Sequence, residues 1–263
     1  MKINFCTIAS GSSGNSAFLS VDGVGILIDA GLSGVAIRAA IENLSEISAI
    51  FVTHEHSDHI KGAGVLSRRL NLPIYATEGT WSYMDYFSSI GKIAPHNRHV
   101  IAAKRAVELE NMRIMPFPIP HDANEPVGYT IEIGSRKISI ATDMGRICSD
   151  VAEAIMDSDI LLIEANHDVD TLKYGSYPEV LKRRILSDLG HLSNVSAGLL
   201  IQQIYTKKLK HIILGHLSEE NNTPQMAYST VEGILDAAKI PINREVTLHV
   251  ARKYGLTSFE LTD

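Results

Sequence analysis

A short apolar run that ends in a cluster of histidines limits what this chain can fold into more than any other feature. AIFVT (49–53) is apolar up to its final threonine, which is typical of a strand buried on both faces. HEHSDH (54–59) follows it directly. Because functional groups in layered α/β folds gather at the carboxyl ends of strands, this position favours a binding or catalytic site. A chance match to the pattern in a chain of this composition is roughly a one-in-a-thousand event.

Four side chains of this run are metal ligands by type: His54, His56, Asp58 and His59. Imidazole and carboxylate groups bind zinc, iron and manganese. His54 and His56 are two residues apart in a turn and can face one ion, whereas Asp58 and His59 enter the next helix and can face a second. The run therefore predicts two divalent ions, zinc or manganese, with iron as a third candidate.

The surrounding pattern predicts two groups of strands. The first group is an antiparallel meander with a hairpin turn at Asp22-Gly23, formed by KINFCTIA (2–9), SAFLSV (16–21) and GILIDA (25–30). The second group is expected at 106–110, 112–117, 127–133 and 136–142, and other strands at 49–53, 73–77, 159–165 and 211–216. Helices are expected at 35–44, after a suitable N-cap at Ser33, and at 62–70, 79–90, 195–208 and 224–240.

These elements predict an α/β fold in four layers, an αββα sandwich with helices outside two mixed sheets. At 263 residues the chain is near the upper size of a single hydrophobic core, and no internal repeat or obvious linker divides it. We therefore expect one domain over residues 1–263.

Composition and charge narrow the range of functions. The net charge of −6 argues against a surface covered in positive potential, but small basic clusters such as Lys182-Arg183-Arg184 leave room for a local phosphate-binding groove. No apolar run approaches the roughly 18 residues of a membrane span, and the start of the chain lacks a signal-type apolar segment. Two cysteines do not suggest a disulfide framework. We expect a cytoplasmic protein without membrane contact.

The motif HEHSDH after an apolar strand, with predicted sheet on both sides, resembles the metallo-β-lactamase superfamily over almost the whole chain. The resemblance implies the αββα metallo-β-lactamase fold. It also implies three further ligands, each placed after a predicted strand: His121, Asp143 and His216. On this resemblance one ion is held by His54, His56 and His121, the other by Asp58, His59 and His216, and Asp143 bridges the two.

Four segments resemble one branch of that superfamily, the YycJ/WalJ-type hydrolases associated with the WalRK two-component operon. They are SGSSGNS (10–16), IEANHD (163–168), GHLSN (190–194) and LGHLSEENN (214–222). Members of this branch are thought of as DNA exonucleases. More distantly, Glu164 and His191 resemble the Glu and His that ribonuclease Z places beside its metal ions. His191 and His216 both lie in GHLS strings, and we favour His216 as the ligand because a buried strand precedes it.

The resemblance implies phosphodiester hydrolysis by a metal-activated hydroxide, in an exonuclease that prefers DNA to RNA and, we expect, runs 5′→3′. Asp58 is expected to hold the nucleophilic water. Glu164 is expected to fix the tautomer of His191, which contacts the phosphate or protonates the leaving oxygen. Substrate contacts are expected from Ser12, Asn15, Asn166, His167 and Asn194.

Two features argue against other nucleases of the fold. The clamp domain of β-CASP nucleases does not fit into the roughly 50 residues between Glu164 and His216. The long exosite arm of ribonuclease Z is not evident either, which argues against tRNA as the substrate.

Two other classes of function stay open from the sequence. A small-molecule hydrolase of the same fold would cleave a thioester, a lactone or a cyclic phosphodiester, and acyl hydrolysis does not need the Glu164–His191 pair. A regulatory binding protein would use the metal only structurally, although a closed structural zinc site needs four ligands rather than seven residues for two ions. A redox diiron protein is disfavoured, because its branch is expected to carry Glu where this chain has His56.

Overall fold

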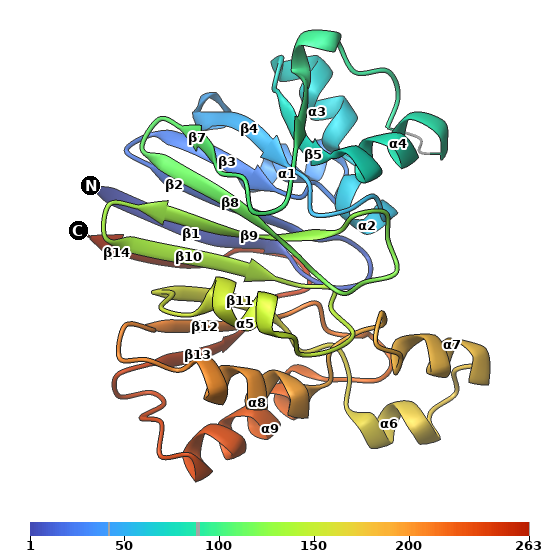
Figure 1. The fold of residues 1–263 in the computed structure, drawn as a ribbon, viewed down its shortest axis with the longest axis vertical. Helices are drawn as coiled ribbons and strands as arrows, with labels where there is room; N and C mark the ends of the chain where they lie inside the picture. Colours follow the sequence, from blue (N-terminus) through green and yellow to red (C-terminus); the bar gives the residue numbers. More distant parts are fainter. Residues whose placement is uncertain (42, 88–89, 263) are drawn as a thin grey trace.

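Two seven-stranded sheets form the centre of the molecule (Figure 1). The computed structural model describes residues 1–41, 43–87 and 90–262. Within them the first sheet has the order β14-β1-β2-β3-β4-β5-β6, and the second has the order β13-β12-β11-β10-β9-β8-β7. Apolar side chains of both sheets meet in the core between them, among them Phe5, Phe51 and Tyr129.

Each sheet is mixed, as predicted. In the first, β14, β1, β2 and β3 are antiparallel neighbours and β3 to β6 are parallel, whereas in the second β7 to β10 are antiparallel and β10 to β13 are parallel. The strands of the first sheet are β1 (Lys2–Ala9), β2 (Ser16–Val21), β3 (Val24–Ile28), β4 (Ile47–Phe51), β5 (Ile74–Thr77), β6 (Arg98–Ile101) and β14 (Thr257–Thr262). Those of the second are β7 (Val107–Leu109), β8 (Met112–Pro118), β9 (Val127–Ile133), β10 (Arg136–Ala141), β11 (Ile160–Glu164), β12 (His211–Gly215) and β13 (Thr247–Val250).

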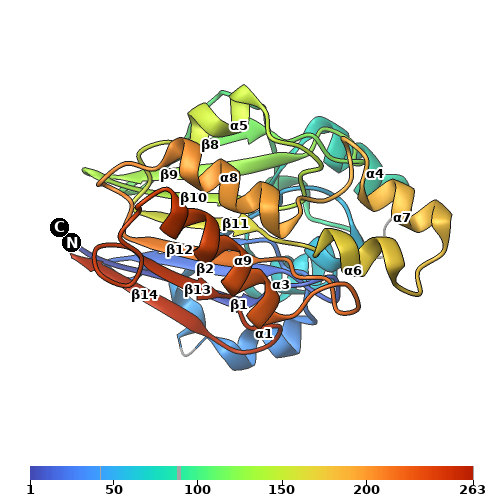
Figure 2. The same cartoon turned by 90° about the horizontal axis from the view of Figure 1, so that it is seen from below.

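Helices cover the outer face of each sheet and complete the four layers. On the first sheet these are α1 (Gly34–Ala40), α2 (Ser57–Ile60), α3 (Ala63–Leu70) and α4 (Glu78–Phe87), which contribute to one apolar cluster. On the second sheet α5 (Ser149–Ile155), α8 (Asn194–Ile204) and α9 (Pro224–Ala237) contribute to another (Figure 2). The predicted αββα sandwich is confirmed. No helix in the described part of the chain is long and apolar enough to cross a membrane.

Two further helices lie at the end of the molecule away from the chain termini (Figure 1). They are α6 (Val169–Tyr174) and α7 (Glu179–Ile185), which follow β11. Two short 3₁₀ turns, Leu44–Glu46 and Pro95–Asn97, connect elements of the first sheet.

Local sequence signals account for several of these elements. Asp22 and Gly23 both have left-handed backbone (φ 48° and 87°), as the tight turn between β2 and β3 requires. The Ser33 hydroxyl accepts the Ala36 N–H at 3.2 Å and caps α1. Pro224 occupies the first turn of α9, where its missing N–H has no helical partner to lose.

Element ends are where the sequence was least informative. The helix predicted at 35–44 ends at Ala40, because Ile41 is extended, and residue 42 lies outside the described part. The helix predicted at 195–208 ends at Ile204, where Tyr205 becomes extended. The helix predicted at 79–90 is α4, which ends at Phe87, and residues 88–89 are not described. Strands β6 and β14 and helices α5, α6 and α7 were not predicted, since each is short or only partly apolar.

Candidate metal centre

The carboxyl ends of strands from both sheets bring acidic and histidine side chains to one edge of the sandwich. Asp29 follows β3, Asp143 lies two residues beyond β10, and His216 follows β12. All three have left-handed backbone, with φ of 62°, 60° and 54°. Such a conformation is unfavourable for a residue with a side chain, and it is held here by surrounding contacts, such as the 2.8 Å hydrogen bond from the His216 N–H to the Ser10 hydroxyl.

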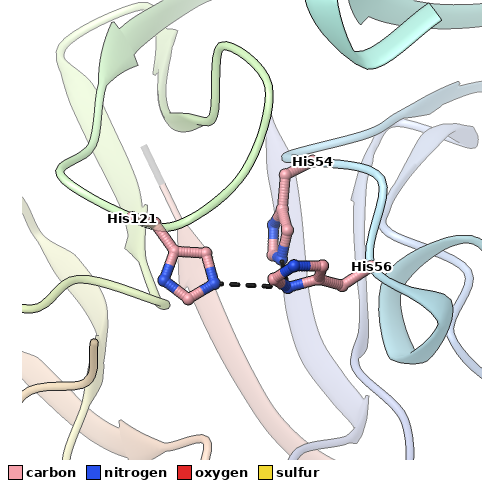
Figure 3. A group of neighbouring side chains, drawn as sticks. All are labelled: His54, His56 and His121. Atoms are coloured by element: carbon pink, nitrogen blue, oxygen red, sulfur yellow. Dashed lines mark hydrogen bonds between the residues drawn. The ribbon is translucent and has the colours of Figure 1, made fainter. Parts of the chain in front are cut away.

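His54, His56 and His121 form the first group of candidate ligands (Figure 3). The Nδ1 atom of His56 lies 3.0 Å from Nε2 of His54 and 3.3 Å from Nε2 of His121. Two nitrogens bound to the same tetrahedral zinc are about 3.3 Å apart, given zinc–nitrogen bonds of about 2.0–2.1 Å. The other nitrogen of His121 donates to the Gly190 carbonyl at 3.1 Å, which fixes the ring.

Asp58, His59 and His216 form the second group. The Oδ2 atom of Asp58 lies 3.4 Å from Nε2 of His59 and 3.6 Å from Nε2 of His216. Each imidazole uses its other nitrogen for a carboxylate: His59 Nδ1 lies 2.7 Å from Asp29, and His216 Nδ1 lies 2.7 Å from Glu164. This is the usual way in which proteins orient a metal-binding histidine.

Asp143 lies between the two groups. Its Oδ2 atom is 3.2 Å from Nε2 of His59 in the second group, and its Oδ1 atom is 3.8 Å from Nε2 of His121 in the first. Among the described residues, neither Asp143 Oδ2 nor His216 Nε2 has a hydrogen-bond partner, although both atoms are buried. A buried polar atom without a partner is costly, and bound cations would satisfy both atoms. The residues present therefore fit a pair of divalent metal ions.

The ionisation of the acidic groups agrees with this fit. Burial opposes the charged form of Asp143, but His216 and His59 outweigh burial and hold the pKa of its carboxyl well below the usual range. The pKa values of His59 and His216 are in turn raised well above normal, because the nearby carboxylates outweigh burial. The site thus attracts positive charge, which metal ions would supply in place of protons.

Glu164 joins the second group to His191. The fully buried carboxylate of Glu164 accepts from His191 Nδ1 at 2.8 Å and from His216 Nδ1 at 2.7 Å, both at Oε1. Its Oε2 accepts the backbone N–H groups of Met144 and Leu192 at 2.8 and 3.0 Å. Burial alone would raise its pKa, but the two histidines lower it to about 2.

A cleft of about 570 Å³ opens beside the two groups. Some of the predicted substrate contacts line this cleft and others do not. Ser12, Asn166 and His191 line the cleft together with Asp58 and Asp143. Three other predicted contacts are buried and are not among its lining residues: Asn15, His167 and Asn194.

Two of these three, Asn15 and Asn194, make side-chain hydrogen bonds within the protein. The Asn15 side-chain amide donates to Asp58 Oδ2 at 3.1 Å, and its oxygen accepts the Gly11 N–H at 2.9 Å. Asn194 exchanges hydrogen bonds with Asn222. Asn15 thus lies beside the candidate ligand Asp58, and Asn194 lies in a buried amide network, so neither lines the cleft in this structure.

Sequence reasoning missed two residues that support the ligands. Asp29 accepts from His59 and also from the N–H and hydroxyl of Thr53, both at 2.8 Å. Glu55, inside the HEHSDH run, accepts the Asn124 N–H at 2.6 Å and so joins the two loops that carry the first group. The sequence does carry a signal for Asp29: like Asp143 and Glu164, it is an acidic residue at the end of an apolar strand.

An αββα sandwich with histidines and carboxylates gathered at one edge of its sheets defines a metallo-hydrolase fold of the metallo-β-lactamase class. The chain belongs to the β-lactamase superfamily, whose domain matches residues 25–216. A relative, the exodeoxyribonuclease YycJ of Bacillus anthracis, is 38% identical over 253 residues, which cover 95% of each protein. The predicted superfamily and branch are confirmed.

Solved structures agree with the fold. The metallo-β-lactamase fold protein YhfI from Bacillus subtilis superposes with a TM-score of 0.73 at 14% identity, over 99% of this chain and all of that one. The short form of human tRNase Z gives a TM-score of 0.65 at 16% identity, over 99% of this chain and all of that one. At this level of identity the likeness concerns the fold alone, and the predicted distant kinship with ribonuclease Z holds at that level.

Proposed function

We propose that the protein is a two-metal phosphodiesterase that degrades DNA as an exonuclease, in the 5′→3′ direction. The naming of its 38%-identical relative as an exodeoxyribonuclease supports the nucleic-acid substrate and the mode of action. The proposal takes residues 1–263 as one catalytic domain, with DNA preferred to RNA.

The proposed ligands follow the two geometric groups. His54, His56 and His121 would hold one ion, Asp58, His59 and His216 the other, and Asp143 would bridge them. His216 is preferred to His191 because its Nε2 is buried, has no hydrogen-bond partner among the described residues and lies 3.6 Å from Asp58. The His191 side chain, by contrast, is 17% exposed.

Two divalent ions at this site would neutralise phosphate charge and make a water molecule nucleophilic near neutral pH. The chain's own groups would complete the chemistry. Asp58, held by the Asn15 amide, lies at the cleft and is placed to accept a proton from the attacking water. His191, with Nδ1 given to Glu164, keeps Nε2 for the phosphate or for the leaving oxygen.

The observation that carries the proposal is the sharing of one Glu164 oxygen between His216 and His191. The shared oxygen orients the proposed ligand His216 and the proposed proton donor His191 together. The His191 imidazole at the cleft therefore keeps a fixed position relative to the proposed metal ions. Hydrolysis of an acyl substrate does not need such a donor on the phosphate side, and this favours phosphodiesters over thioesters and lactones.

The test is digestion of end-labelled single- and double-stranded DNA and RNA by protein reconstituted with zinc or manganese. We expect release of the 5′ label as mononucleotide, a ladder of shortening products from the 3′ label, slower RNA cleavage and no activity after chelation. Internal fragments without terminal products would contradict the exonuclease. If the protein does not cleave nucleic acids but hydrolyses a thioester or lactone rapidly, it is a small-molecule hydrolase and the proposed nuclease function is wrong.

A further inference from the structure

Three consecutive basic residues on α7 have different surroundings. Lys182 is buried, and its Nζ donates to the backbone oxygen of Lys173 at 2.8 Å. Arg183 is exposed and does not line the cleft. Arg184 does line it, together with Asp58 and His191 of the candidate site. Only one residue of the cluster is therefore placed to meet a substrate.

An acidic neighbour orients Arg184. Its Nε donates to Asp122 Oδ2 at 2.5 Å, and the other oxygen of Asp122 lies 3.5 Å from Nε2 of His121. The Asp122 carboxylate thus connects the guanidinium to a residue of the first histidine group. Within the described ranges the two terminal nitrogens of Arg184 have no hydrogen-bond partner, although its side chain is only 52% exposed. They are available to a ligand in the cleft.

The rest of the cleft matches a nucleic-acid strand. Lys61 provides a second cation, Tyr83 and Tyr177 provide aromatic rings, and Ile60 and Ile185 provide apolar surface. Cations that follow the phosphates, with aromatic and apolar side chains for the bases, are the usual composition of a single-strand binding groove. A guanidinium held at Nε presents a planar fork that matches two phosphate oxygens.

We propose that Arg184, positioned by Asp122, binds the DNA phosphate next to the one that is cleaved. This subsite rests on the proposed function, because it assigns a partner to the neighbouring phosphate of the same substrate. The contact distinguishes an oligonucleotide from a small phosphodiester, because the small substrate has no second phosphate for Arg184 to bind.

Binding is measured first, by fluorescence anisotropy of a labelled, phosphorothioate-linked oligothymidine against the metal-loaded protein. Arg184→Gln should weaken binding by about 10- to 100-fold, as expected for a lost hydrogen-bonded charge pair. It should also reduce the slope of log affinity against log salt by about 0.7, the value for one phosphate contact on a single strand. Arg183→Gln, the matched control on the same helix, should leave both unchanged. Arg184→Lys keeps the charge without the fork and should fall between.

Kinetics then locate the contact. The kcat/KM for DNA, relative to that for bis(p-nitrophenyl) phosphate, should fall about 10- to 100-fold in Arg184→Gln, mainly through KM. One neutral methylphosphonate next to the cleaved linkage should remove the difference between wild type and Arg184→Gln. Asp122→Asn should raise KM for DNA in the same direction and by less.

The outcomes separate the subsite from the proposed function. Equal DNA affinity of the Arg184→Gln and Arg183→Gln variants would overturn the subsite even if the protein degrades DNA. If wild type and Arg184→Gln still differ in kcat/KM on the methylphosphonate substrate, Arg184 does not bind the neighbouring phosphate. Wild-type protein that binds DNA through Arg184 without cutting it would contradict the nuclease, and only a DNA-phosphate contact of Arg184 would remain of the subsite.

Discussion

The two halves of the candidate metal centre are built in different ways. The half on the first sheet comes from one segment, HEHSDH after β4, which carries four candidate ligands within six residues. The half on the second sheet is assembled from the ends of separate strands, with His121 after β8, Asp143 after β10 and His216 after β12. Ligands that lie within one short segment can be recognised in the sequence. Ligands on separate strands come together only when the chain folds, so the sequence alone does not show that they form one site.

The two halves also differ in how their histidines are supported. In the first, the Thr53 hydroxyl lies 3.0 Å from His54 Nδ1 and 3.2 Å from His59 Nδ1, and Asp29 holds His59 at 2.7 Å. In the second, a single oxygen of Glu164 serves both His216 and His191. Loss of the Glu164 carboxylate is therefore expected to affect a candidate metal ligand and the histidine at the cleft together.

The largest effect should come from the residue that joins the halves. Asp143→Asn removes the charge between the two groups but keeps a residue that tolerates the left-handed backbone at φ 60°. We expect metal content to fall from about two ions to one or none, with loss of DNA hydrolysis. Metal analysis and the end-label assay measure this, and a wild-type far-UV circular dichroism spectrum of the chelated variant serves as the control for folding. A variant that retains both ions would show that Asp143 is not the bridge.

The next effect tests whether His191 belongs to the ligands or to the substrate. His191→Ala should keep both metals and lose at least about tenfold in DNA hydrolysis, and up to about 10²–10⁴-fold if His191 is the proton donor. A substrate with a nitrophenolate leaving group should suffer less, because that group leaves without a proton. Intact DNA cleavage would show that His191 neither contacts the phosphate nor donates a proton, and that the GHLSN loop is structural.

The sequence was sufficient for the layers of the fold and for the half of the site that lies in HEHSDH. The strands of the two sheets are mostly apolar runs, and their alternation with helices along the chain predicts the sandwich. His121, Asp143 and His216 came from resemblance, since one histidine or aspartate after a strand is common. The proposed role of Arg184 and the burial of Asn15 depend on side-chain packing across elements distant in sequence, which no local pattern encodes.

A third prediction concerns how His167, a buried residue near Glu164, affects the stability of the protein at different pH values. Burial lowers the pKa of His167 from the ordinary 6.5 to about 4, and its Nδ1 has no hydrogen-bond partner in the residues described. As pH falls from 6.5 towards 4, the unfolded chain binds a proton that the folded protein does not, so the free energy of unfolding decreases. The loss attributable to His167 is about 3 kcal/mol.

Urea unfolding of the chelated protein at several pH values measures this loss. The His167→Asn variant should show a shallower decline between pH 6.5 and 4 than the wild type. Parallel declines in the two proteins would mean that His167 titrates normally in the folded state.

The smallest effect is expected within HEHSDH itself. Glu55 is buried, and its carboxylate accepts the Asn124 N–H at 2.6 Å rather than joining either ligand group. Glu55→Ala should cost about 1–3 kcal/mol of stability by leaving that N–H without an acceptor, and should keep both metals. Glu55→Gln retains an acceptor and should cost less. Loss of metal in Glu55→Gln would show that the compact half is not as independent as its contacts indicate.

The convergence of the two halves on a pair of ions is tested most directly by anomalous diffraction from metal-loaded crystals. We predict two peaks about 3.5–4 Å apart. One should be bound by His54, His56 and His121, the other by Asp58, His59 and His216, with Asp143 in contact with both. A single peak, or ligation by His191 in place of His216, would contradict this account.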